Sequence, residues 1–285
     1  MTARLVHRHA ELVDLRRPGQ QIAVVMTMGA LHEGHGELVR EARSVVGPHG
    51  SVIVTDFVNP LQFGAGEDFD RYPRTLEDDV DLASAAGADI VFAPDVAEVY
   101  GDGDPHGPRV TISAGPLGTI LEGAARPGHF DGMLTVVGTF LHLTAPQFAL
   151  FGEKDYQQLV LVQQMVEQLR FPTTILPVAT VRESDGLAMS SRNRYLTPEQ
   201  RAAAASVPRA LIAATIDAEL QGAQSGVRAG LEVLAAEPLI EVDYLVITDP
   251  MLGPATTGQA RALAAVRIGR TRLIDNMPCT VEAAS

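Results

Sequence analysis

The chain has 285 residues, is 46% hydrophobic and carries a formal net charge of −13, which indicates one large or two ordinary globular domains. The acidic balance argues against a nucleic-acid partner, although a few well-placed cations can still bind a small anionic substrate. No apolar run is long enough to cross a bilayer and the N-terminus lacks an apolar signal core, so the sequence predicts a cytoplasmic protein with no membrane partner.

Short apolar strands alternate with helix-like segments through the first two thirds of the chain. The predicted strands cover residues 22–26, 51–57, 89–92, 147–151 and 173–178. The predicted helices cover residues 35–46, 76–86, 133–143 and 156–169. This alternation predicts an α/β fold with a parallel sheet covered on both faces. Ligands of such sheets lie beyond the carboxyl ends of the strands, here the loops 27–35, 57–75 and 152–155.

The pattern changes after about residue 180. Thr197 is a suitable N-cap, Pro198 fits the first helical position, and Gln200 completes a capping box. Alanine-rich helices are predicted over residues 209–221 and 227–236, followed by strands over 242–247, 261–268 and 271–274. We therefore expect two domains, a parallel-sheet domain over residues 1–180 and a smaller α+β domain over residues 181–285.

The stretch M-T-M-G-A-L-H-E-G-H, residues 26–35, lies where the first predicted strand turns into a helix. Free backbone N–H groups and the positive end of the helix dipole make such a turn an anion site. Gly29 and Gly34 would let a ligand approach the backbone closely. His32 and His35 are three residues apart, so both can face the same side of the first helical turn and donate to phosphate oxygens.

Other interpretations of these histidines are weaker. A zinc hydrolase uses H-E-x-x-H, and here the second histidine comes one residue early. A single histidine would be an ordinary surface or capping residue, but two of them beside two glycines at a strand-to-helix turn favour a functional role. The stretch is neither a G-x-G-x-x-G dinucleotide fingerprint nor a P-loop.

Polar side chains follow the second predicted strand as well. Asn59 and Gln62 can read hydroxyls or a carboxylate of a small substrate, and the long loop 57–75 resembles an active-site cover. The next helix opens with Glu77, Asp78 and Asp79. These carboxylates either complement the helix dipole, which is the simpler interpretation, or help to hold Mg²⁺.

Two later stretches suit a nucleotide. Lys154 and Asp155 follow another strand end, where lysine suits phosphate and aspartate accepts from ribose hydroxyls, and the alternative is a surface salt bridge. Gln158 lies one turn into the following helix and can face the cleft. The stretch D-G-L-A-M-S-S-R-N-R-Y-L, residues 185–196, combines hydroxyls with guanidinium groups. Together these stretches suit a polyphosphate like that of ATP, a ribose and a small hydroxylated acid.

Five motifs occur in order between about residues 26 and 196: T-M-G-A-L-H-x-G-H, F-V-N-P-x-Q-F, L-E-G-x-x-R-P-x-H-F, G-E-K-D-Y-Q-Q and D-G-L-A-M-S-S-R-N-x-Y-L. This combination resembles the pantothenate synthetase (pantoate–β-alanine ligase) family. The resemblance implies a Rossmann-like sheet of the nucleotidyltransferase type with an H-x-G-H signature, a smaller C-terminal domain closing over the active site, and a cytoplasmic homodimer. It also implies two steps, in which D-pantoate and Mg-ATP form pantoyl adenylate and pyrophosphate, and β-alanine then displaces AMP to give pantothenate.

The resemblance implies site residues at the matching positions. Catalytic contacts with the ATP phosphates are expected from His32, His35, Lys154 and Arg192. Other ATP contacts are expected from Met28, Gly152, Asp155, Val181, Met189 and Ser190, of which Gly152 and Asp155 would meet the ribose and Val181 and Met189 the adenine. Pantoate would be held by Gln62 and Gln158, and Asp78 matches a position that helps to bind Mg²⁺.

Three positions depart from the family pattern. Met26 stands where proline is usual, Asp56 where an apolar residue is usual, and Gly138 where a helix usually carries a bulkier residue. A charge at the end of a central strand is unfavourable unless it is paired, so Asp56 needs a partner. Two alternatives stay open: a nucleotide-binding protein without catalysis, and a related nucleotidyltransferase with another acceptor.

Overall fold

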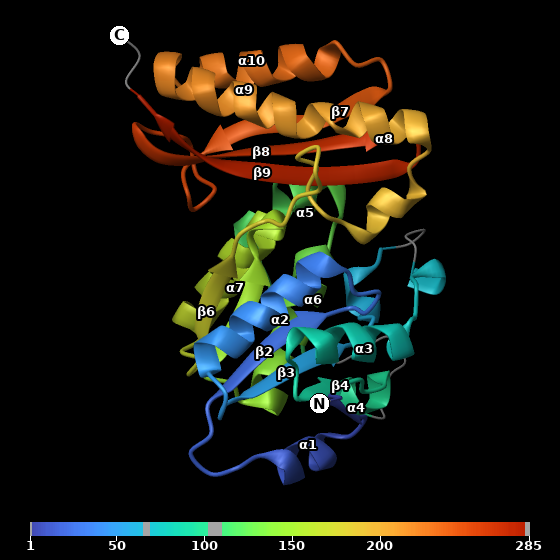
Figure 1. Ribbon diagram of the computed structural model, residues 1–285. Coiled ribbons are helices and arrows are strands. Elements are labelled where there is room, and N and C mark those ends of the chain that lie inside the picture. Colours follow the sequence, from blue (N-terminus) through green and yellow to red (C-terminus); the bar gives the residue numbers. More distant parts are fainter. Residues whose placement is uncertain (1, 65–68, 102–109, 283–285) are drawn as a thin grey trace. The chain divides into compact units, whose positions relative to one another are not determined.

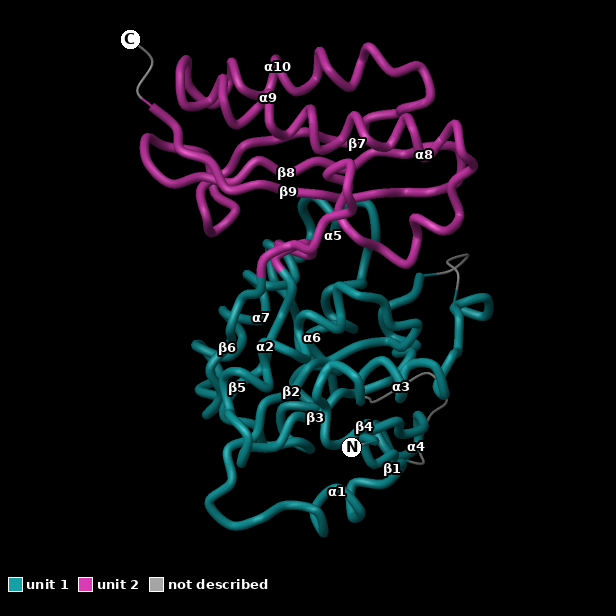
Figure 2. The backbone as a smooth tube through the Cα atoms, in the orientation of Figure 1, with its two compact units in different colours: residues 1–152, 157–178 teal, residues 153–156, 179–285 magenta. Residues whose placement is uncertain are grey.

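The computed structural model in Figure 1 describes residues 2–64, 69–101 and 110–282. The chain divides into two compact units, which Figure 2 colours separately. Unit 1 comprises residues 1–152 and 157–178, and unit 2 comprises residues 153–156 and 179–285. Among the described residues, every helix is too short or too polar to cross a bilayer.

The described part of unit 1 contains a six-stranded parallel sheet in the order β1-β4-β3-β2-β5-β6. Its strands are β1 (Arg4–Val6), β2 (Ile22–Thr27), β3 (Ser51–Asp56), β4 (Ile90–Phe92), β5 (Phe148–Gly152) and β6 (Thr174–Val178). After β2 the chain builds outward through β3 and β4 and then returns to place β5 on the other side of β2. The switch point of the sheet therefore lies between β2 and β5, where ligands of such sheets usually bind.

Helices cover both faces of this sheet. They are α1 (His9–Leu15), α2 (Glu33–Val46), α3 (Leu76–Ala86), α4 (Val96–Tyr100), α5 (Glu122–Ala125), α6 (His129–Thr144) and α7 (Tyr156–Gln168). Figure 1 shows α2 lying along β2 and β3, and its Val39 packs in one core with Val25 and Val91. Phe92 follows Val91 in β4 and so points to the opposite face, where its ring lies 6.1 Å from that of Phe140 in α6.

Two of the three unusual positions are accommodated by this packing. Met26 is half-buried in β2, where it pairs with Thr55 of β3, so the strand continues through it. Gly138 lies on the buried side of α6, and a Cβ atom there would come within 2.8 Å of the Ile112 side chain. Glycine at this position lets the Ile112 segment lie close against the helix.

The described part of unit 2 contains an antiparallel three-stranded sheet in the order β7-β8-β9. Its strands are β7 (Ile240–Thr248), β8 (Gly258–Ile268) and β9 (Thr271–Val281), and its helices are α8 (Pro198–Ala204), α9 (Ser206–Gln221) and α10 (Ala223–Ala235). Both α9 and α10 pack on one face of this sheet, where Ala214 and Leu234 meet Leu245 and Ala264. The predicted fold class, a Rossmann-like parallel sheet with a smaller α+β part, is confirmed.

The ends of two elements show how local sequence decides them. Thr197 Oγ1 accepts a hydrogen bond from the backbone N–H of Gln200 at 3.3 Å, and Gln200 Oε1 accepts one from the backbone N–H of Thr197 at 3.1 Å. The predicted capping box is therefore confirmed. The last strand is longer than the predicted 271–274, because β9 pairs with β8 as far as Val281. Its polar residues Asp275 and Asn276 are buried with partners from the same unit.

Candidate active site

The turn after β2 has an unusual backbone that α3 stabilises. Gly29 and Ala30 have φ values of 78° and 52°, and the left-handed conformation of an alanine is unfavourable by about 1 kcal/mol. The Asp79 carboxylate accepts hydrogen bonds from Ala30 N at 2.9 Å and Leu31 N at 2.6 Å, and another from Thr75 Oγ1 at 3.1 Å. Asp79 is only 2% exposed, so α3 holds the turn through a buried carboxylate.

The two histidines cap α2 reciprocally. His32 is the N-cap, and its Nδ1 accepts from Gly34 N at 3.1 Å, while His35 Nδ1 accepts from His32 N at 3.2 Å. Their ring centroids are 4.1 Å apart, which confirms that both rings face one side of the first turn. A ring nitrogen that accepts an N–H bond carries no proton, so each ring holds its proton on Nε2. Both Nε2 atoms are therefore donors at the positive end of α2.

Asp56 ends β3 beside this turn, and its partner is another carboxyl group. A Cβ atom on Gly29 would lie 2.5 Å from Asp56 Oδ1 and 3.3 Å from Asp79 Oδ2, so both carboxyls approach the Gly29 backbone. Burial raises the pKa of Asp56 to about 7, and the charge of Asp79 and a hydrogen bond between the two side chains act in the same direction. Sequence reasoning identified Asp56 as needing a partner but had no signal for Asp79.

Gln62 is held in place by its neighbour Asn59, which is completely buried. Asn59 Nδ2 donates to Gln62 Oε1 at 3.0 Å and to Gly132 O at 3.1 Å. Asn59 Oδ1 accepts from Leu61 N at 3.2 Å and from Tyr100 OH at 2.8 Å. These four bonds use the full capacity of the amide, so the interpretation of Asn59 as a substrate reader is wrong. Because Gln62 Oε1 already accepts from Asn59, the group that Gln62 can offer a ligand is its Nε2 donor.

Two residues of the R-P-x-H-F motif hold the backbone of Gln62. Gln62 O accepts from Arg126 Nη2 at 3.1 Å and from His129 Nδ1 at 2.9 Å. Since a carbonyl can only accept, His129 donates from Nδ1, and its Nε2 accepts from Arg126 Nη1 at 3.1 Å. Gly132 is required next to them, because a Cβ atom there would lie 2.0 Å from Leu61 O. Sequence reasoning quoted this motif but missed its positioning role.

The adjacent glutamines of α7 have different environments. Gln157 is buried, donates to Leu117 O at 2.7 Å and Ile120 O at 2.9 Å, and accepts from Glu122 N at 3.0 Å. Gln158 is half-buried and makes no side-chain hydrogen bond within the part of the chain that the structure describes. Of the two, Gln158 is therefore the one with an amide to offer a ligand.

The remaining predicted residues of unit 1 lie at strand ends or at a helix start. Met28 is half-buried in the turn after β2, and Gly152 ends β5 with nothing within 4 Å of an added Cβ. Asp78 is exposed in the first turn of α3, next to the engaged Asp79. Residues 65–68 of the predicted cover loop 57–75 lie outside the described residues.

In unit 2, the sheet fixes the backbone of Lys154. Asn276 Nδ2 donates to Glu153 O and Lys154 O, both at 2.9 Å. Arg261 Nη2 donates to Glu153 Oε2 at 2.8 Å, and its guanidinium lies 4.1 Å from the centre of the Tyr156 ring. The flanking residues of the G-E-K-D-Y motif are therefore anchors for Lys154.

The side chains of Lys154 and Asp155 are close to one another. Lys154 Nζ lies 3.7 Å from Asp155 Oδ1, and the two side chains are 19% and 51% exposed. This separation is too long for a direct hydrogen bond, and ion pairs near the protein surface contribute little stability. The salt-bridge alternative therefore explains why the two side chains are close, but their interaction is weak.

A short hairpin brings Val181 and Met189 side by side. Met189 N donates to Val181 O at 2.9 Å, and Arg182 pairs with Ala188 in an antiparallel bridge. Arg182 binds the buried Asp275 through Nη1 at 2.7 Å and Nη2 at 3.0 Å. The hairpin is thus attached to β9 through a two-point ion pair.

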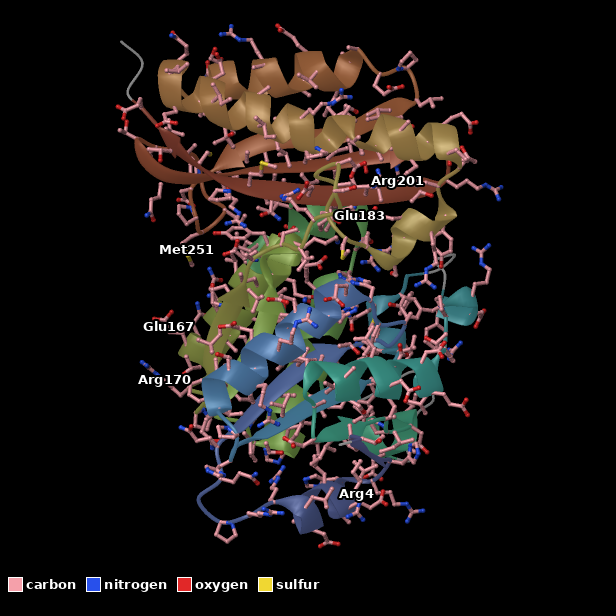
Figure 3. All side chains as sticks on the ribbon, viewed as in Figure 1. Arg4, Glu167, Arg170, Glu183, Arg201 and Met251 are labelled. Carbon is pink, nitrogen blue, oxygen red and sulfur yellow. The ribbon has the colours of Figure 1, made fainter. Side chains whose placement is uncertain are left out.

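The S-S-R-N stretch follows this hairpin. Ser190 is the N-cap of a 3₁₀ helix over Ser191–Tyr195, and its Oγ accepts from Arg192 N at 3.3 Å. The Arg192 guanidinium makes no ion pair within the described residues, whereas Arg201 Nη2 binds Glu183 Oε2 at 2.7 Å (Figure 3). Arg192 is therefore a cation whose charge is available to a ligand.

The candidate residues divide between the units. Unit 1 brings together Met28, His32 and His35 after β2, and it also holds Gln62, Asp78, Gly152 and Gln158. Unit 2 holds Lys154, Asp155, Val181, Met189, Ser190 and Arg192. Among the described residues, no group of three or more His, Cys, Asp or Glu side chains is arranged to hold a metal ion.

The fold and this geometry define a class of protein, a Rossmann-like α/β protein with a histidine-capped helix start at the switch point of its sheet. Residues 2–278 match the family described as pantoate-beta-alanine ligase. The pantothenate synthetase of Nocardioides sp. (strain ATCC BAA-499 / JS614) is 54% identical over 286 residues, covering 96% of this chain and 84% of its own. That of Mycolicibacterium smegmatis is 52% identical over 272 residues, covering 95% and 84%.

Solved structures agree with these sequences. Pantothenate synthetase from Thermus thermophilus has a TM-score of 0.88 and 48% identity, covering 96% of this chain and 98% of its own. Pantoate-beta-alanine ligase from Francisella tularensis, complexed with beta-gamma ATP and beta-alanine, has a TM-score of 0.77 and 31% identity, covering 96% and 97%. The chain belongs to the pantoate-beta-alanine ligase family, so it is a ligase that forms an amide bond, and the resemblance drawn from the motifs is confirmed.

Proposed function

We propose that this chain condenses D-pantoate with β-alanine to pantothenate at the expense of ATP. In the first step a pantoate carboxylate oxygen attacks the α-phosphorus of ATP, and pyrophosphate leaves to give pantoyl adenylate. In the second step the amine of β-alanine attacks the acyl carbon, AMP leaves, and the amine proton passes to solvent. The family assignment and the Francisella relative bound to beta-gamma ATP and beta-alanine support these substrates.

One observation carries the first step: the reciprocal capping of His32 and His35. Because each Nδ1 accepts a backbone N–H, each ring presents an Nε2–H donor at the N-terminus of α2. Negative charge develops on the leaving pyrophosphate, and preorganised donors strengthen their interaction as it does. We assign these two donors to the ATP phosphates and the Met28 backbone to the reacting carboxylate.

Unit 2 supplies the cations in this proposal. Lys154 and Arg192, with the hydroxyl of Ser190, bind the β- and γ-phosphates, for which a guanidinium offers parallel hydrogen bonds. Asn276 anchors the Lys154 backbone and so fixes the point from which the lysine side chain extends, which supports this role. Asp155 then accepts from a ribose hydroxyl.

The remaining ATP contacts come from backbone groups. The Gly152 backbone, open because nothing lies within 4 Å of an added Cβ, meets the ribose. The hairpin backbone at Val181 and Met189 meets the adenine, and pairing between the two residues supports this by keeping the two segments in register.

Gln62 and Gln158 hold pantoate in this proposal. Gln62 is oriented by Asn59, Arg126 and His129, so its amide keeps one position before substrate arrives. Pre-positioned groups of this kind contribute to rate because the reacting carboxylate is already aligned. The second step needs a neutral amine and exclusion of water from the adenylate.

Mg²⁺ enters this proposal with ATP. Magnesium in nucleotide sites usually takes one or two carboxylates plus substrate phosphates, and the exposed Asp78 fits that requirement. Asp79 does not, because hydrogen bonds from Ala30, Leu31 and Thr75 already occupy its oxygens. When bound, Mg²⁺ would neutralise phosphate charge. The homodimer and the cytoplasmic location remain predictions.

The test is ATP–pyrophosphate exchange with Mg²⁺ and no β-alanine, with and without D-pantoate. Exchange that requires pantoate supports the adenylate step, and β-alanine should then release AMP. Exchange with another acceptor instead would favour a related nucleotidyltransferase, and ATP binding without exchange would favour a protein without catalysis. His49→Ala is the matched control for His35→Ala, because His49 is an exposed histidine at the other end of α2.

A further inference from the structure

Tyr100, the last residue of α4, is linked to Gln62 by two consecutive hydrogen bonds. Its hydroxyl donates to Asn59 Oδ1 at 2.8 Å, and Asn59 Nδ2 donates to Gln62 Oε1 at 3.0 Å. Asn59 is completely buried and Gln62 is 7% exposed, so water competes little for these bonds. Tyr100 therefore acts on the candidate pantoate ligand Gln62 through Asn59, although it lies outside the five sequence motifs.

The direction of both bonds is fixed by two backbone groups that contact Asn59. Leu61 N can only donate, and it donates to Asn59 Oδ1 at 3.2 Å. Gly132 O can only accept, and it accepts from Asn59 Nδ2 at 3.1 Å. The Asn59 amide therefore has one orientation, in which Tyr100 must donate to it and Gln62 Oε1 must accept from it. Gln62 consequently presents the N–H donors of its Nε2 to a ligand.

Aromatic packing holds the Tyr100 ring in place. Its centroid lies 6.1 Å from that of Phe57 with the two rings at 72°, and the Phe57 ring in turn lies 5.7 Å from that of Phe140. Edge-to-face contacts of this kind are favourable and specify the ring orientation. Burial also raises the pKa of the Tyr100 phenol, so the hydroxyl keeps its proton at neutral pH. Tyr100 is thus a donor that is already positioned before a ligand arrives.

We propose that Tyr100 is a positioning residue for pantoate, whose hydroxyl completes the hydrogen bonds of Asn59 and so keeps the Gln62 amide directed at an acceptor oxygen of the substrate. This inference rests on the proposed function, which assigns Gln62 to pantoate. Without the hydroxyl, Asn59 Oδ1 would keep the bond from Leu61 N, and a buried acceptor position would be left unfilled. The Asn59 amide, and with it the Gln62 amide, would then be held less firmly.

The first experiment is Tyr100→Phe, which removes the hydroxyl and keeps the ring, in pantoate-dependent pyrophosphate exchange. The KM for pantoate should rise about fivefold to tenfold, as expected for the loss of one neutral hydrogen bond, and the KM for ATP should not change. Tyr244→Phe is the matched control, because it removes the hydroxyl of a half-buried tyrosine in β7 of unit 2. An unchanged KM for pantoate in Tyr100→Phe, or an equal rise in both KM values, would overturn the proposal.

A double-mutant cycle separates positioning of Gln62 from a general loss of structure. The affinity for D-pantoate is measured by calorimetry, with Mg²⁺ and a non-hydrolysable ATP analogue, in wild type, Tyr100→Phe, Gln62→Ala and the double variant. Tyr100→Phe should weaken binding about fivefold to tenfold when Gln62 is present and should have no further effect once it is alanine. Equal weakening in both backgrounds would overturn the proposal, because Tyr100 would then act by another route.

A measurement without substrate keeps the two hypotheses separable. In nuclear magnetic resonance spectra of the wild-type protein, the side-chain amide protons of Asn59 should exchange slowly with solvent, and they should exchange faster in Tyr100→Phe. Rapid exchange in wild type would overturn the proposal even if Tyr100→Phe does not fold. If wild type shows neither pantoate-dependent exchange nor pantoate binding, the proposed function fails, while these spectra still decide whether Tyr100 holds Asn59.

Discussion

Replacing Arg182 by methionine should destabilise unit 2 while leaving the sheet of unit 1 unaffected. The Asp275 side chain is 1% exposed and receives two hydrogen bonds from the Arg182 guanidinium, at 2.7 and 3.0 Å. Its third bond, from Asn276 N at 2.7 Å, remains after the substitution. Methionine fills much of the arginine volume, so the change removes charge and donors more than packing.

The magnitude follows from the burial of Asp275. Removing one partner of a buried ion pair costs about 3–5 kcal/mol, because the remaining charge is left without compensation. The Arg182 side chain is 25% exposed, so water can reach part of the vacated volume and the lower end, about 3 kcal/mol, is expected. Asp275→Asn in the Arg182→Met background should recover about 2 kcal/mol, because it removes the uncompensated charge.

Hydrogen exchange followed by mass spectrometry suits this test, because it reports the opening free energy of each unit separately. Peptides from β9 should exchange faster in Arg182→Met, and peptides from β3 should not. The matched control is Arg267→Met on the same sheet, whose side chain is 46% exposed and binds Asp243 at 3.1 Å. A surface pair of this kind contributes under about 1 kcal/mol. Equal effects of the two substitutions, or an equal effect on β3, would refute the reasoning.

Three further predictions concern unit 1. The pKa of Asp56 is raised from 3.8 to about 7, so the folded state binds this proton more tightly than the unfolded state does. The resulting contribution to the free energy of unfolding is fully present below pH 3.8 and is lost as the pH rises through about 7. Urea unfolding at several pH values should show this loss, at most about 4 kcal/mol, and Asp56→Asn should abolish it. Gly132→Ala places a Cβ atom 2.0 Å from Leu61 O, so it should lower the free energy of unfolding by about 1–3 kcal/mol in thermal unfolding. It should also raise the KM for pantoate, and an unchanged KM would contradict the placement of Gln62. His35→Ala should slow pantoate-dependent exchange about 10²–10³-fold, and near-normal exchange would reject its contact with phosphate.

Local pattern was sufficient for the strands and helices that build the core. The predicted strand over 22–26 is β2, which ends one residue later, because a continuous apolar run bounded by a glycine turn has few other stable conformations. Very short elements were missed, including the three-residue strand β1, which is held at the sheet edge by pairing with β4. The end of β9 was missed too, since Asp275 and Asn276 are unfavourable in a strand until a partner compensates them.

The candidate site was predictable to the extent that its chemistry follows from motifs. His32 and His35 could be placed together from their spacing alone, because three residues is close to one helical turn. The role of Asn59 could not be predicted, because nothing in a linear pattern shows that Gly132, Leu61 and Tyr100 would use every bond of its amide. Whether a polar residue reads a ligand or positions another residue depends on contacts across the fold.

The sequence by itself determined the fold class, the order of the main core elements and the family, because periodicity and motif spacing are properties of neighbouring residues. Only the tertiary structure decided that residues 153–156 associate with unit 2, since Arg261 and Asn276 bind them from more than a hundred positions away. It also decided that the partner of Asp56 is a second carboxyl group. A buried charge is compensated by whatever polar group the packing brings near it, and that group need not be close in the chain.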